Sequence, residues 1–555
     1  MCGIFSLLNN DIFDADLVNK SFQKGKSRGP ENSKLTKVNI LCDFGFHRLA
    51  INGLNSKSNQ PITVNDITLI CNGEIYNHEE LYLMLSIIPK TDSDCEVIIH
   101  LYEKYGIEYT LQLLDGVFSF ILCDSRLTNE DSRIYIARDP YGVRPLYYLK
   151  PKNNNIYGFA SEIKVLIDLH KESFSHEIIH FEPGTYSIFS LPTTVSPKWS
   201  PVIENRKYHS IGHVNIYSFH KLDYFDTIFN LLCSSVKKRV LNTERPIACL
   251  LSGGLDSSLI TSLVHHYMKK GTVLETYSIG LQDSEDLKYA KIVANFLGTK
   301  HTEVILTEQD FLDAIPEVIY AIESYDTTTV RASIGNYLIA KYIREHSEAK
   351  VIFNGDGADE LCGGYLYMNY TDDSLDFDFE TRRLLTDIHK FDVLRSDKSI
   401  SSNGLEPRTP FLDKTFVQYY LSLHPSTRFH KFSYQCEKYL LRNSFNRIIG
   451  DRCVLPDEIL WRKKEAFSDG VSKKSRSLYQ IIQEHVSSMG NLPIFYALHY
   501  HHNNPDTKEK QYYRYIYEQY YPNTEKLVPY FWMPKWVNAT DASARTLDIY
   551  NENNN

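Results

Sequence analysis

The stretch "IACLLSGGLDSS", residues 247–258, decides the fold of the second half of the chain. An apolar run ends in two glycines, and "DSSLITSLVHHYMKK" follows with the spacing of a helix. A short buried strand that passes through glycines into a helix is typical of an α/β domain with a parallel sheet. Ligands of such sheets bind beyond the carboxyl ends of the strands, which is where the glycines fall.

The turn "SGGLDSS" at 252–258 has the residues that a phosphate site requires. Two glycines leave room for phosphate oxygens and three serines supply hydroxyl groups: Gly253, Gly254, Ser252, Ser257 and Ser258. The following helix offers free N–H groups and a positive dipole end. The lysine of a Walker A loop is missing, and Asp256 instead supplies a carboxylate suited to magnesium. The alternative is a capped serine–glycine turn, but this residue order after an apolar strand favours phosphate binding.

Outward from this turn, strands and helices alternate. Further strands are expected at 274–280, 301–306 and 350–360, with helices near 287–298, 309–323 and 333–346. This alternation predicts a parallel sheet that is covered on both faces. The acidic stretch "TDDSLDFDFE" at 371–380 is interpreted as a solvated loop, and the final "NENNN" as disordered.

The first 190 or so residues follow a different pattern. Short β-like runs occur at 67–77, 116–124, 133–140 and 145–150, and the clearest helix is expected at 93–106. This pattern predicts an α+β domain with substantial sheet. The three prolines of "LPTTVSPKWSPVIENRKYH", which begins at residue 191, indicate a connection between the two domains.

Bulk composition excludes several classes of protein. The chain has 555 residues, which predicts two to four domains, and its net charge of −9 gives no electrostatic reason to bind nucleic acid or an anionic membrane. No apolar run approaches the roughly 20 residues that span a bilayer. The ten cysteines include no C-x-x-C pair, so a zinc site or a dense disulfide framework is not expected. We expect a reduced, soluble protein of the cytoplasm.

The opening "MCGIF" places a cysteine at position 2, with no histidine nearby in sequence to act as its base. A thiol must lose its proton before it attacks a carbonyl. If Met1 is removed, Cys2 carries a free α-amine, and the ordinary α-amine pKa of about 7.7–8.0 suits a base at neutral pH. The hypothesis is therefore a terminal nucleophile that acts as its own base.

The same domain contains groups suited to an amino-acid amide. Arg48 could hold a carboxylate and Asp94 an ammonium group. Asn72 and the N–H of Gly73 could donate to an oxyanion. Taken singly, Arg48 could belong to a surface ion pair, and Asn72 with Gly73 could form a hairpin turn.

Together "MCGIF", "HRLAI", "NGEIYN", "TDSDCE" and "RDPYGVRPLYY" resemble the class II glutamine amidotransferases. The resemblance implies an N-terminal-nucleophile fold, an αββα sandwich, that hydrolyses glutamine to glutamate and ammonia. By this resemblance Cys2, Asn72 and Gly73 are catalytic. The implied glutamine-binding residues are Arg48, Leu49, Ala50, Ile51, Asn52, Asn72, Gly73, Glu74 and Asp94.

The loop "SGGLDSS" resembles the pyrophosphate loop of ATP pyrophosphatases, which activate an acid as an adenylate. With "IESYDTTTVRAS", "GDGADELCGGYLY", "GLEPRTPFLD", "EKYLLRNSF" and "WRKKEAFSDGV", nearly the whole chain resembles the glutamine-hydrolysing asparagine synthetases. The implied organisation is a glutaminase domain at 2–190, a connection at 191–225, an ATP-pyrophosphatase domain at 226–535 and a C-terminal segment at 536–555.

The resemblance also assigns roles in the second domain. Asp356 and Lys464 are implied to be catalytic, and Asp356 stands where the family often has glutamate. The implied ATP-binding residues are Leu251, Ser252, Gly253, Gly254, Asp256, Ser257, Ser258, Ile279, Asn354 and Gly355. Asp256 and Asp359 would bind Mg²⁺ with ATP. The implied residues for aspartate or its adenylate are Arg331, Asp356, Tyr365, Asp392 and Arg395.

The implied reaction joins the two sites. Cys2 forms a glutamyl thioester and releases ammonia, which displaces AMP from β-aspartyl-AMP to give asparagine. The expected ligands are glutamine, aspartate and ATP, and the resemblance suggests a homodimer. Two alternatives remain: a different ligase on the same two domains, such as a β-lactam-forming or peptidoglycan-amidating relative, and a degenerate homologue that only binds or regulates.

Overall fold

The computed structural model describes most of the chain. The described residues are 1–126, 131–173, 175–192, 197–213, 224–431, 436–462, 464, 470–472, 476–489 and 500–547. The predicted disordered end and much of the predicted connection, 193–196 and 214–223, lie outside the described residues. Within the described part, none of the helices has the length and apolar character needed to cross a membrane.

The first domain is built on two antiparallel sheets of six strands each. Sheet A has the order β10 (His176–His180), β8 (Tyr147–Pro151), β9 (Tyr157–Ala160), β1 (Gly3–Leu8), β3 (Cys42–Arg48), β2 (Asn32–Asn39). Sheet B has the order β12 (Ser200–Lys207), β11 (Thr185–Leu191), β7 (Ser132–Arg138), β6 (Gly116–Asp124), β5 (Ile67–Ile75), β4 (Ile62–Val64). All four strands predicted for this domain are present.

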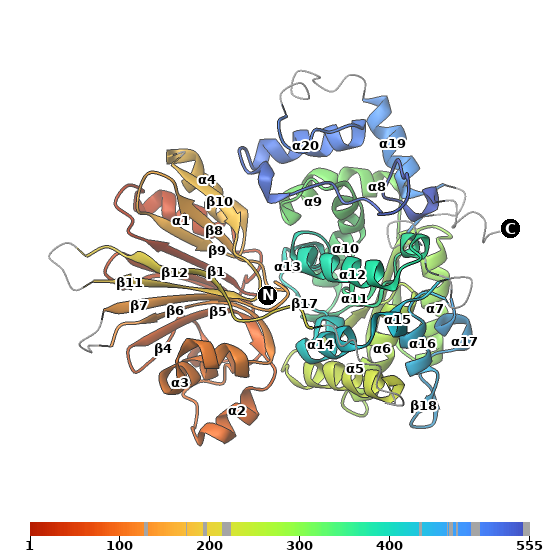
Figure 1. The fold of residues 1–555 in the computed structure, drawn as a ribbon, viewed down its shortest axis with the longest axis horizontal. Helices are drawn as coiled ribbons and strands as arrows, with labels where there is room; N and C mark the ends of the chain where they lie inside the picture. Colours follow the sequence, from red (N-terminus) through yellow and green to blue (C-terminus); the bar gives the residue numbers. More distant parts are fainter. Residues whose placement is uncertain are drawn as a thin grey trace.

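Helices cover the outer faces of both sheets. Figure 1 shows α1 (Ala15–Gln23) and α4 (Ile163–Ser173) on sheet A, and α2 (His78–Leu85) and α3 (Val97–Leu113) on sheet B. Between the sheets, apolar residues such as Ile4, Phe44 and Ile121 form a dry core. The result is the expected αββα sandwich, in which β1 places Cys2 at a sheet end.

The proline-rich stretch after residue 190 is not purely a connection. Residues 200–207 form β12, which pairs with β11 and completes sheet B, so the boundary expected at 190 is too early. Pro201 is tolerated because β12 is the edge strand, where a missing N–H removes no hydrogen bond from the sheet interior. Prolines therefore marked an edge here rather than a linker.

The second domain contains a parallel five-stranded sheet. Its order is β15 (Lys300–Leu306), β14 (Glu275–Leu281), β13 (Ile247–Leu250), β16 (Val351–Phe353), β17 (Glu406–Arg408). The first four strands were predicted. The short β17 was not, because three residues that include a proline carry almost no strand signal.

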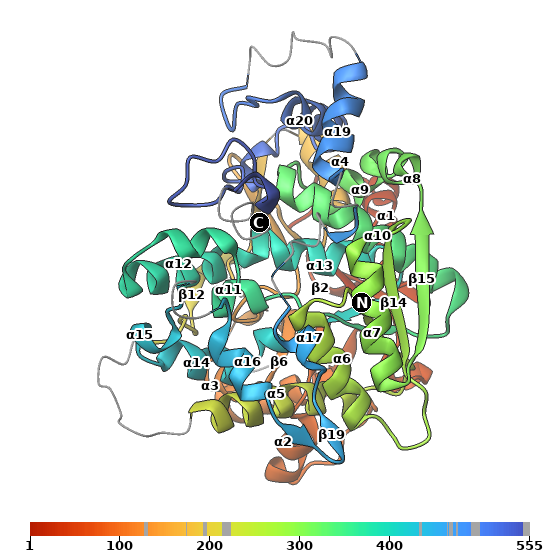
Figure 2. The ribbon, with the colours of Figure 1, turned by 90° about the vertical axis from the view of Figure 1, so that its right-hand side faces the viewer.

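Both faces of this sheet are buried, as successive residues of its strands show. Cys249 packs with α5 (Tyr224–Leu241), α6 (Leu255–Tyr267) and α7 (Glu285–Leu297) in one core. Ala248 packs in the other core with α9 (Ile315–Ile322) and α10 (Thr327–His346). Figure 2 shows α6 and α7 beside β14, with α19 and α20 at the far end of the domain. Further helices are α8 (Glu308–Asp313), α11 (Ala358–Cys362), α13 (Asp392–Ser401), α14 (Lys414–Ser422), α16 (Tyr439–Phe445), α17 (Asp457–Leu460), α19 (Leu478–Ser488) and α20 (Lys508–Tyr520).

The acidic stretch 371–380 is not a loop, which corrects the interpretation from sequence. It leads into α12 (Ser374–Asp387), which begins where the Asp373 side chain accepts from the Leu375 N–H. Phe377 and Glu380 face inward, and Glu380 accepts from the Tyr367 hydroxyl at 2.8 Å. Two acidic residues of the helix, Asp378 and Glu380, are buried and paired with arginines, and the pairing of Asp378 with Arg428 needs the tertiary structure.

The two domains meet around the N-terminus, which lies between them in Figure 1. The Met1 ammonium group donates to the Leu405 carbonyl at 3.1 Å, across the junction. Nearby, Asp397 of α13 accepts from Arg28 at 2.7 Å and from Arg144 at 3.3 Å. The chain's first residues thus touch the second domain directly.

Candidate active sites

The first site surrounds Cys2, immediately before β1. Its thiol donates to the Leu49 carbonyl at 3.6 Å. Burial raises the pKa of the thiol, and the nearby N-terminal ammonium group partly opposes that effect. With Met1 present the Cys2 nitrogen is a peptide nitrogen, so a base at this position requires removal of Met1.

Arg48 is close to Cys2 but its donors are used by a loop. One terminal nitrogen donates to the Asn55 carbonyl at 2.9 Å and to Asn59 at 2.7 Å, and the other donates to the carbonyls of Asn52 and Gly53. Arg48 therefore shapes the 52–59 loop in this structure. Its role as a substrate ligand stays a prediction.

Two predicted residues, Asn72 on β5 and Asp94 beside it, lie in the same domain as Cys2. The Asn72 amide donates to Ser161 at 3.5 Å, and Ser161 also accepts from the Ile4 N–H at 3.0 Å, two residues along the chain from Cys2. The Asn72 amide oxygen is buried and has no hydrogen-bond partner in the described ranges of the chain. Asp94 accepts from the Ile75 N–H at 2.7 Å, and burial raises the pKa of this carboxyl.

Glu74 connects the remaining predicted residues to the junction. It accepts from the Asn52 amide at 2.7 Å and lies 3.4 Å from Arg408 of the second domain. Burial, with Glu406 and Asp94 nearby, raises its pKa well above the usual range. Leu49, Ala50 and Ile51 continue from β3 and are buried. Most of the predicted glutamine-binding residues are therefore buried, and Asn52 and Gly73 are half-buried.

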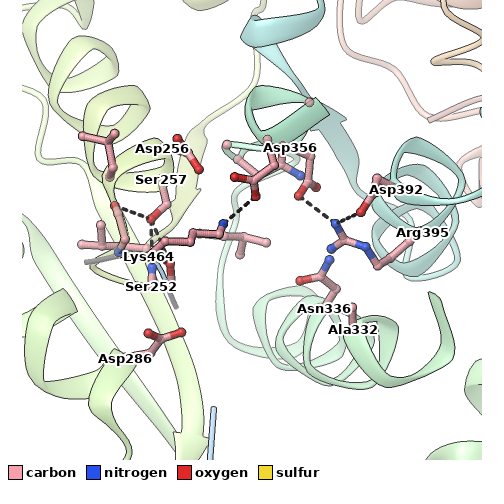
Figure 3. Close-up of a pocket in the computed structure, with 18 of the residues that line it drawn as sticks. Ser252, Asp256, Ser257, Asp286, Ala332, Asn336, Asp356, Asp392, Arg395 and Lys464 are labelled. Carbon is pink, nitrogen blue, oxygen red and sulfur yellow. Dashed lines mark hydrogen bonds and ion pairs between the residues drawn. The ribbon is translucent and has the colours of Figure 1, made fainter. Parts of the chain in front are cut away.

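The second site is a cavity of about 210 Å³ in the second domain. It is lined by most residues predicted for ATP and aspartate: Leu251, Ser252, Gly254, Asp256, Ser257, Ile279, Asn354, Gly355, Asp356, Asp359, Tyr365, Asp392, Arg395 and Lys464. They come from the ends of β13, β14 and β16 and from α13, as expected for ligands beyond parallel strands. Figure 3 shows the serine turn at one side and Arg395 at the other.

The serine turn is built around Ser257. Its hydroxyl contacts that of Ser252 at 3.0 Å, and Gly254 begins α6 without any side-chain cap. The free N–H groups of this helix start are therefore left for a ligand. Gly253 and Ser258 do not line the cavity: Gly253 packs against Tyr289 and Ala290, and Ser258 is fully buried.

Asp256 and Asp359 face each other near the centre of the cavity. The Lys438 ammonium group lies 2.5 Å from each of them, and Lys464 lies 2.5 Å from Asp359. Burial opposes the charge of Asp359, but the two lysines hold the pKa of its carboxyl well below the usual range. Asp256 Oδ1 is buried and makes no hydrogen bond within the described part of the chain.

These carboxylates fit a magnesium ion shared with a nucleotide. No group of three or more metal-ligating side chains occurs among the residues that the structure describes, so phosphate oxygens would complete the shell. Asp256 and Asp359 would hold the ion.

At the other side of the cavity, Arg395 joins two carboxylates. Its guanidinium lies 3.2 Å from Asp356 and 3.0 Å from Asp392. Tyr365 donates to Glu360 and, at 3.4 Å, to Asp392. Asp356 Oδ2 has no hydrogen-bond partner among the residues that the structure describes, which leaves it available to a ligand.

Arg331, predicted to bind aspartate or its adenylate, also lies outside the cavity. Its guanidinium is 3% exposed and donates to Glu509 of α20 and Asp541 near the C-terminus. It does not line the cavity, although its neighbours Thr328 and Ala332 do. The helix predicted near 333–346 did not include Arg331, and the sequence does not show which face of α10 this residue occupies.

Lys438 lines the cavity and contacts both carboxylates that were predicted to bind the metal. It lies within "EKYLLRNSF", which carried the family resemblance, yet no role was assigned to it. In the sequence, Glu437 and Lys438 look like an exposed pair of charged residues. The carboxylates that Lys438 contacts, Asp256 and Asp359, are 182 and 79 residues away, so the neighbouring sequence gives no sign of them. Only the fold reveals them.

Comparison with known proteins matches both halves of the chain to described families. A family model described as a glutamine amidotransferase domain matches residues 1–195, and one described as asparagine synthase matches 227–382 and 369–537. The chain is 41% identical over 574 residues to the asparagine synthetase [glutamine-hydrolyzing] of Cricetulus griseus, covering 99% of each. Those of Gallus gallus and Homo sapiens are 41% and 39% identical, again over 99% of each chain.

The chain joins an amidotransferase domain to a parallel-sheet domain that contains the glycine- and serine-rich turn at 252–258. This combination defines the class of protein: a glutamine-dependent carbon–nitrogen ligase. Within that class, the chain belongs to the asparagine synthase family.

Proposed function

We propose that this protein makes asparagine and glutamate from aspartate, glutamine, ATP and water, with AMP and pyrophosphate as the other products. The observation that carries the proposal is the position of Cys2. It lies at the junction with the second domain, where Met1 contacts Leu405, and that domain contains the cavity with the serine turn.

In the first step, removal of Met1 frees the Cys2 amine, which takes the thiol proton. The thiolate attacks the glutamine amide carbon, and the oxyanion is stabilised by the Asn72 amide and the Gly73 N–H. The carbon–nitrogen bond breaks, ammonia leaves with the transferred proton, and a γ-glutamyl thioester remains. Water then hydrolyses the thioester to glutamate.

In the second step, the β-carboxylate of aspartate attacks the α-phosphorus of ATP. The N–H groups at the start of α6, with Ser252 and Ser257, hold the phosphates, and Lys464 stabilises their charge. Pyrophosphate leaves and β-aspartyl-AMP remains. A bound Mg²⁺ would neutralise phosphate charge, with Asp256 and Asp359 as its protein ligands.

In the third step, ammonia attacks the acyl carbon of β-aspartyl-AMP and displaces AMP. Ammonia must lose a proton in this step, and Asp356 is the carboxylate proposed to accept it, directly or through water. Because ammonia is protonated in bulk water, its transfer through the junction between the domains is part of the proposal.

The test is substitution of the thiol. Cys2→Ala should abolish asparagine formation from glutamine and leave formation from ammonium salts within about twofold of wild type, because the second site is untouched. Cys453→Ser, at an exposed cysteine far from both sites, is the matched control. Retained glutaminase activity in Cys2→Ala would exclude Cys2 as the nucleophile. Formation of AMP and pyrophosphate without aspartate would favour a ligase with a different acceptor.

A further inference from the structure

Lys438 occupies the space between the two carboxylates assigned to the metal. Its side chain is 1% exposed, and its ammonium nitrogen lies 2.5 Å from Asp256 Oδ2 and 2.5 Å from Asp359 Oδ1. No other described lysine contacts both carboxylates, since Lys464 contacts Asp359 alone. The two carboxylates are thus joined by one cation that belongs to the chain.

The backbone around this contact has an unfavourable conformation. Lys438 has φ 57° and ψ 30°, the left-handed region, at the residue before α16. A lysine in this region is sterically disfavoured, and such residues persist where surrounding contacts impose them. The chain therefore keeps an unfavourable backbone where it delivers the ammonium group.

Gly364 makes the space for the same contact. A Cβ at this position would collide with the Asp359 carboxylate and with Lys438 Cε. A strained lysine and a glycine that is distant from it in sequence therefore both support one bridge, the contact of Lys438 with Asp256 and Asp359. A simple surface ion pair requires neither.

The bridge made by Lys438 affects the net charge of this part of the cavity. Asp256 and Asp359 together balance Lys438 and Lys464, so this part of the cavity is close to neutral before any ligand arrives. A divalent ion between the carboxylates would meet the Lys438 ammonium group at the same place. Two cations cannot share it without strong repulsion. Phosphate oxygens would offer the ammonium group another partner.

We propose that Lys438 is an internal counter-ion that holds Asp256 and Asp359 together until a nucleotide arrives, and thereby makes divalent-metal binding depend on the nucleotide. The inference rests on the proposed ATP site. Lys438 is a positioning residue: it keeps the carboxylates at a fixed separation and moves toward the phosphates when the metal enters. Free metal ion alone does not occupy the pair.

The experiment measures Mn²⁺ binding to the full chain without nucleotide, by electron paramagnetic resonance of the free ion. Wild type should bind Mn²⁺ weakly. Lys438→Met keeps the length of the side chain and removes its charge, so the nucleotide-free affinity should rise at least tenfold. Adding Asp359→Asn to Lys438→Met should abolish that gain, because one of the two carboxylates is lost.

Lys464→Met is the matched control, since it removes one cation from the cavity but leaves the bridge intact. Its gain in Mn²⁺ affinity should stay below about threefold if the bridge, rather than general charge, excludes the metal. Lys438→Gln, whose amide can still donate to both carboxylates, serves if the methionine variant does not fold. Thermal unfolding confirms the fold of each variant.

Two results would overturn the inference: unchanged nucleotide-free affinity in folded Lys438→Met or Lys438→Gln, or equal gains in the Lys438 and Lys464 variants. Tight Mn²⁺ binding by the wild-type protein without nucleotide would also overturn the inference. Failure of the proposed function looks different, because wild type would then bind no non-hydrolysable ATP analogue, whatever its affinity for Mn²⁺.

Discussion

At the scale of single residues, burial sets protonation states in the first domain. His47 of β3 is 2% exposed, stacks on Phe22 at 3.9 Å between ring centroids, and places Nε2 2.9 Å from the Phe22 carbonyl. Burial lowers the pKa of His47 from 6.5 to about 4, although the carbonyl contact opposes it. The neutral ring is therefore part of the native structure.

This pKa predicts acid sensitivity of the first domain. Between pH 6.5 and pH 4 the unfolded chain binds a proton at His47 that the folded chain does not, so stability falls as the pH is lowered through this window. The loss is about 2 kcal/mol between roughly pH 7 and pH 5. Hydrogen exchange of the β1 and β3 amides, corrected for intrinsic rates, measures it. His47→Gln should lose about 2 kcal/mol less over the same range, and an equal loss would contradict the assignment.

Gly253 and Gly254 are adjacent but have different requirements. Gly253 has φ +70°, and a Cβ there would collide with the backbone of Tyr289 and Ala290. At Gly254 the nearest atom to a Cβ is Ser252 Oγ at 3.3 Å, and φ is −72°. Gly253 is therefore constrained by packing, whereas Gly254 would be constrained only by a phosphate group bound at the start of α6.

Gly253→Ala should thus destabilise the second domain by more than about 2 kcal/mol, and Gly254→Ala by less than about 1 kcal/mol. Differential scanning calorimetry of both variants gives the comparison. Gly253→Ala should also lose synthesis from both glutamine and ammonium salts, while glutaminase activity persists. Equal stability of the two variants would exclude the packing argument.

At the scale of elements, Arg331 attaches α10 to α20 and to the C-terminal segment. It is buried with Glu509 at 2.5 Å and Asp541 at 2.7 Å. The partners hold the pKa of Arg331 well above its usual range despite its burial. A carboxylate left in this position without its arginine would be strongly destabilising.

Arg331→Met should destabilise the second domain by about 3–5 kcal/mol and release the segment after residue 535. Limited proteolysis followed by mass spectrometry should show new cleavage there. Arg476→Ala removes an exposed pair with Glu308 and Glu484, and should change stability by at most about 1 kcal/mol. If Arg331 bound aspartate instead, its loss would raise the KM for aspartate and leave the cleavage pattern unchanged.

At the scale of the whole molecule, Asp397 joins the domains. It accepts from Arg28 at 2.7 Å, and the Arg28 Nε donates to the Cys2 carbonyl at 2.9 Å. Asp397 lies two residues after Arg395, which lines the second cavity. The same helix, α13, therefore contacts both sites.

Asp397→Asn should weaken this junction and reduce the asparagine formed per glutamate released by at least threefold, because ammonia escapes when the domains separate. Synthesis from ammonium salts should fall by less than twofold. The test is the ratio of asparagine to glutamate, measured at saturating ATP and aspartate. Lys198→Ala, which removes a surface pair with Asp11, should leave the ratio unchanged. An unchanged ratio in Asp397→Asn would exclude this role for the junction.

The sequence was sufficient to predict most strands, the turn at 252–258 and the short motifs. Alternating apolar runs and helical periodicity fixed four of the five parallel strands, and the order strand, SGG, helix located the phosphate turn, because these signals depend on neighbouring residues only. Five short motifs likewise identified the amidotransferase half.

Features that depend on contacts between residues far apart in the sequence required the tertiary structure. It turned an acidic stretch into α12, completed sheet B with a proline-containing edge strand, and placed Arg331 in a buried ion pair outside the cavity. It also brought Lys438 between two carboxylates far away in sequence. A sequence shows which charges a chain carries, but which charges face each other depends on how its helices and sheets pack.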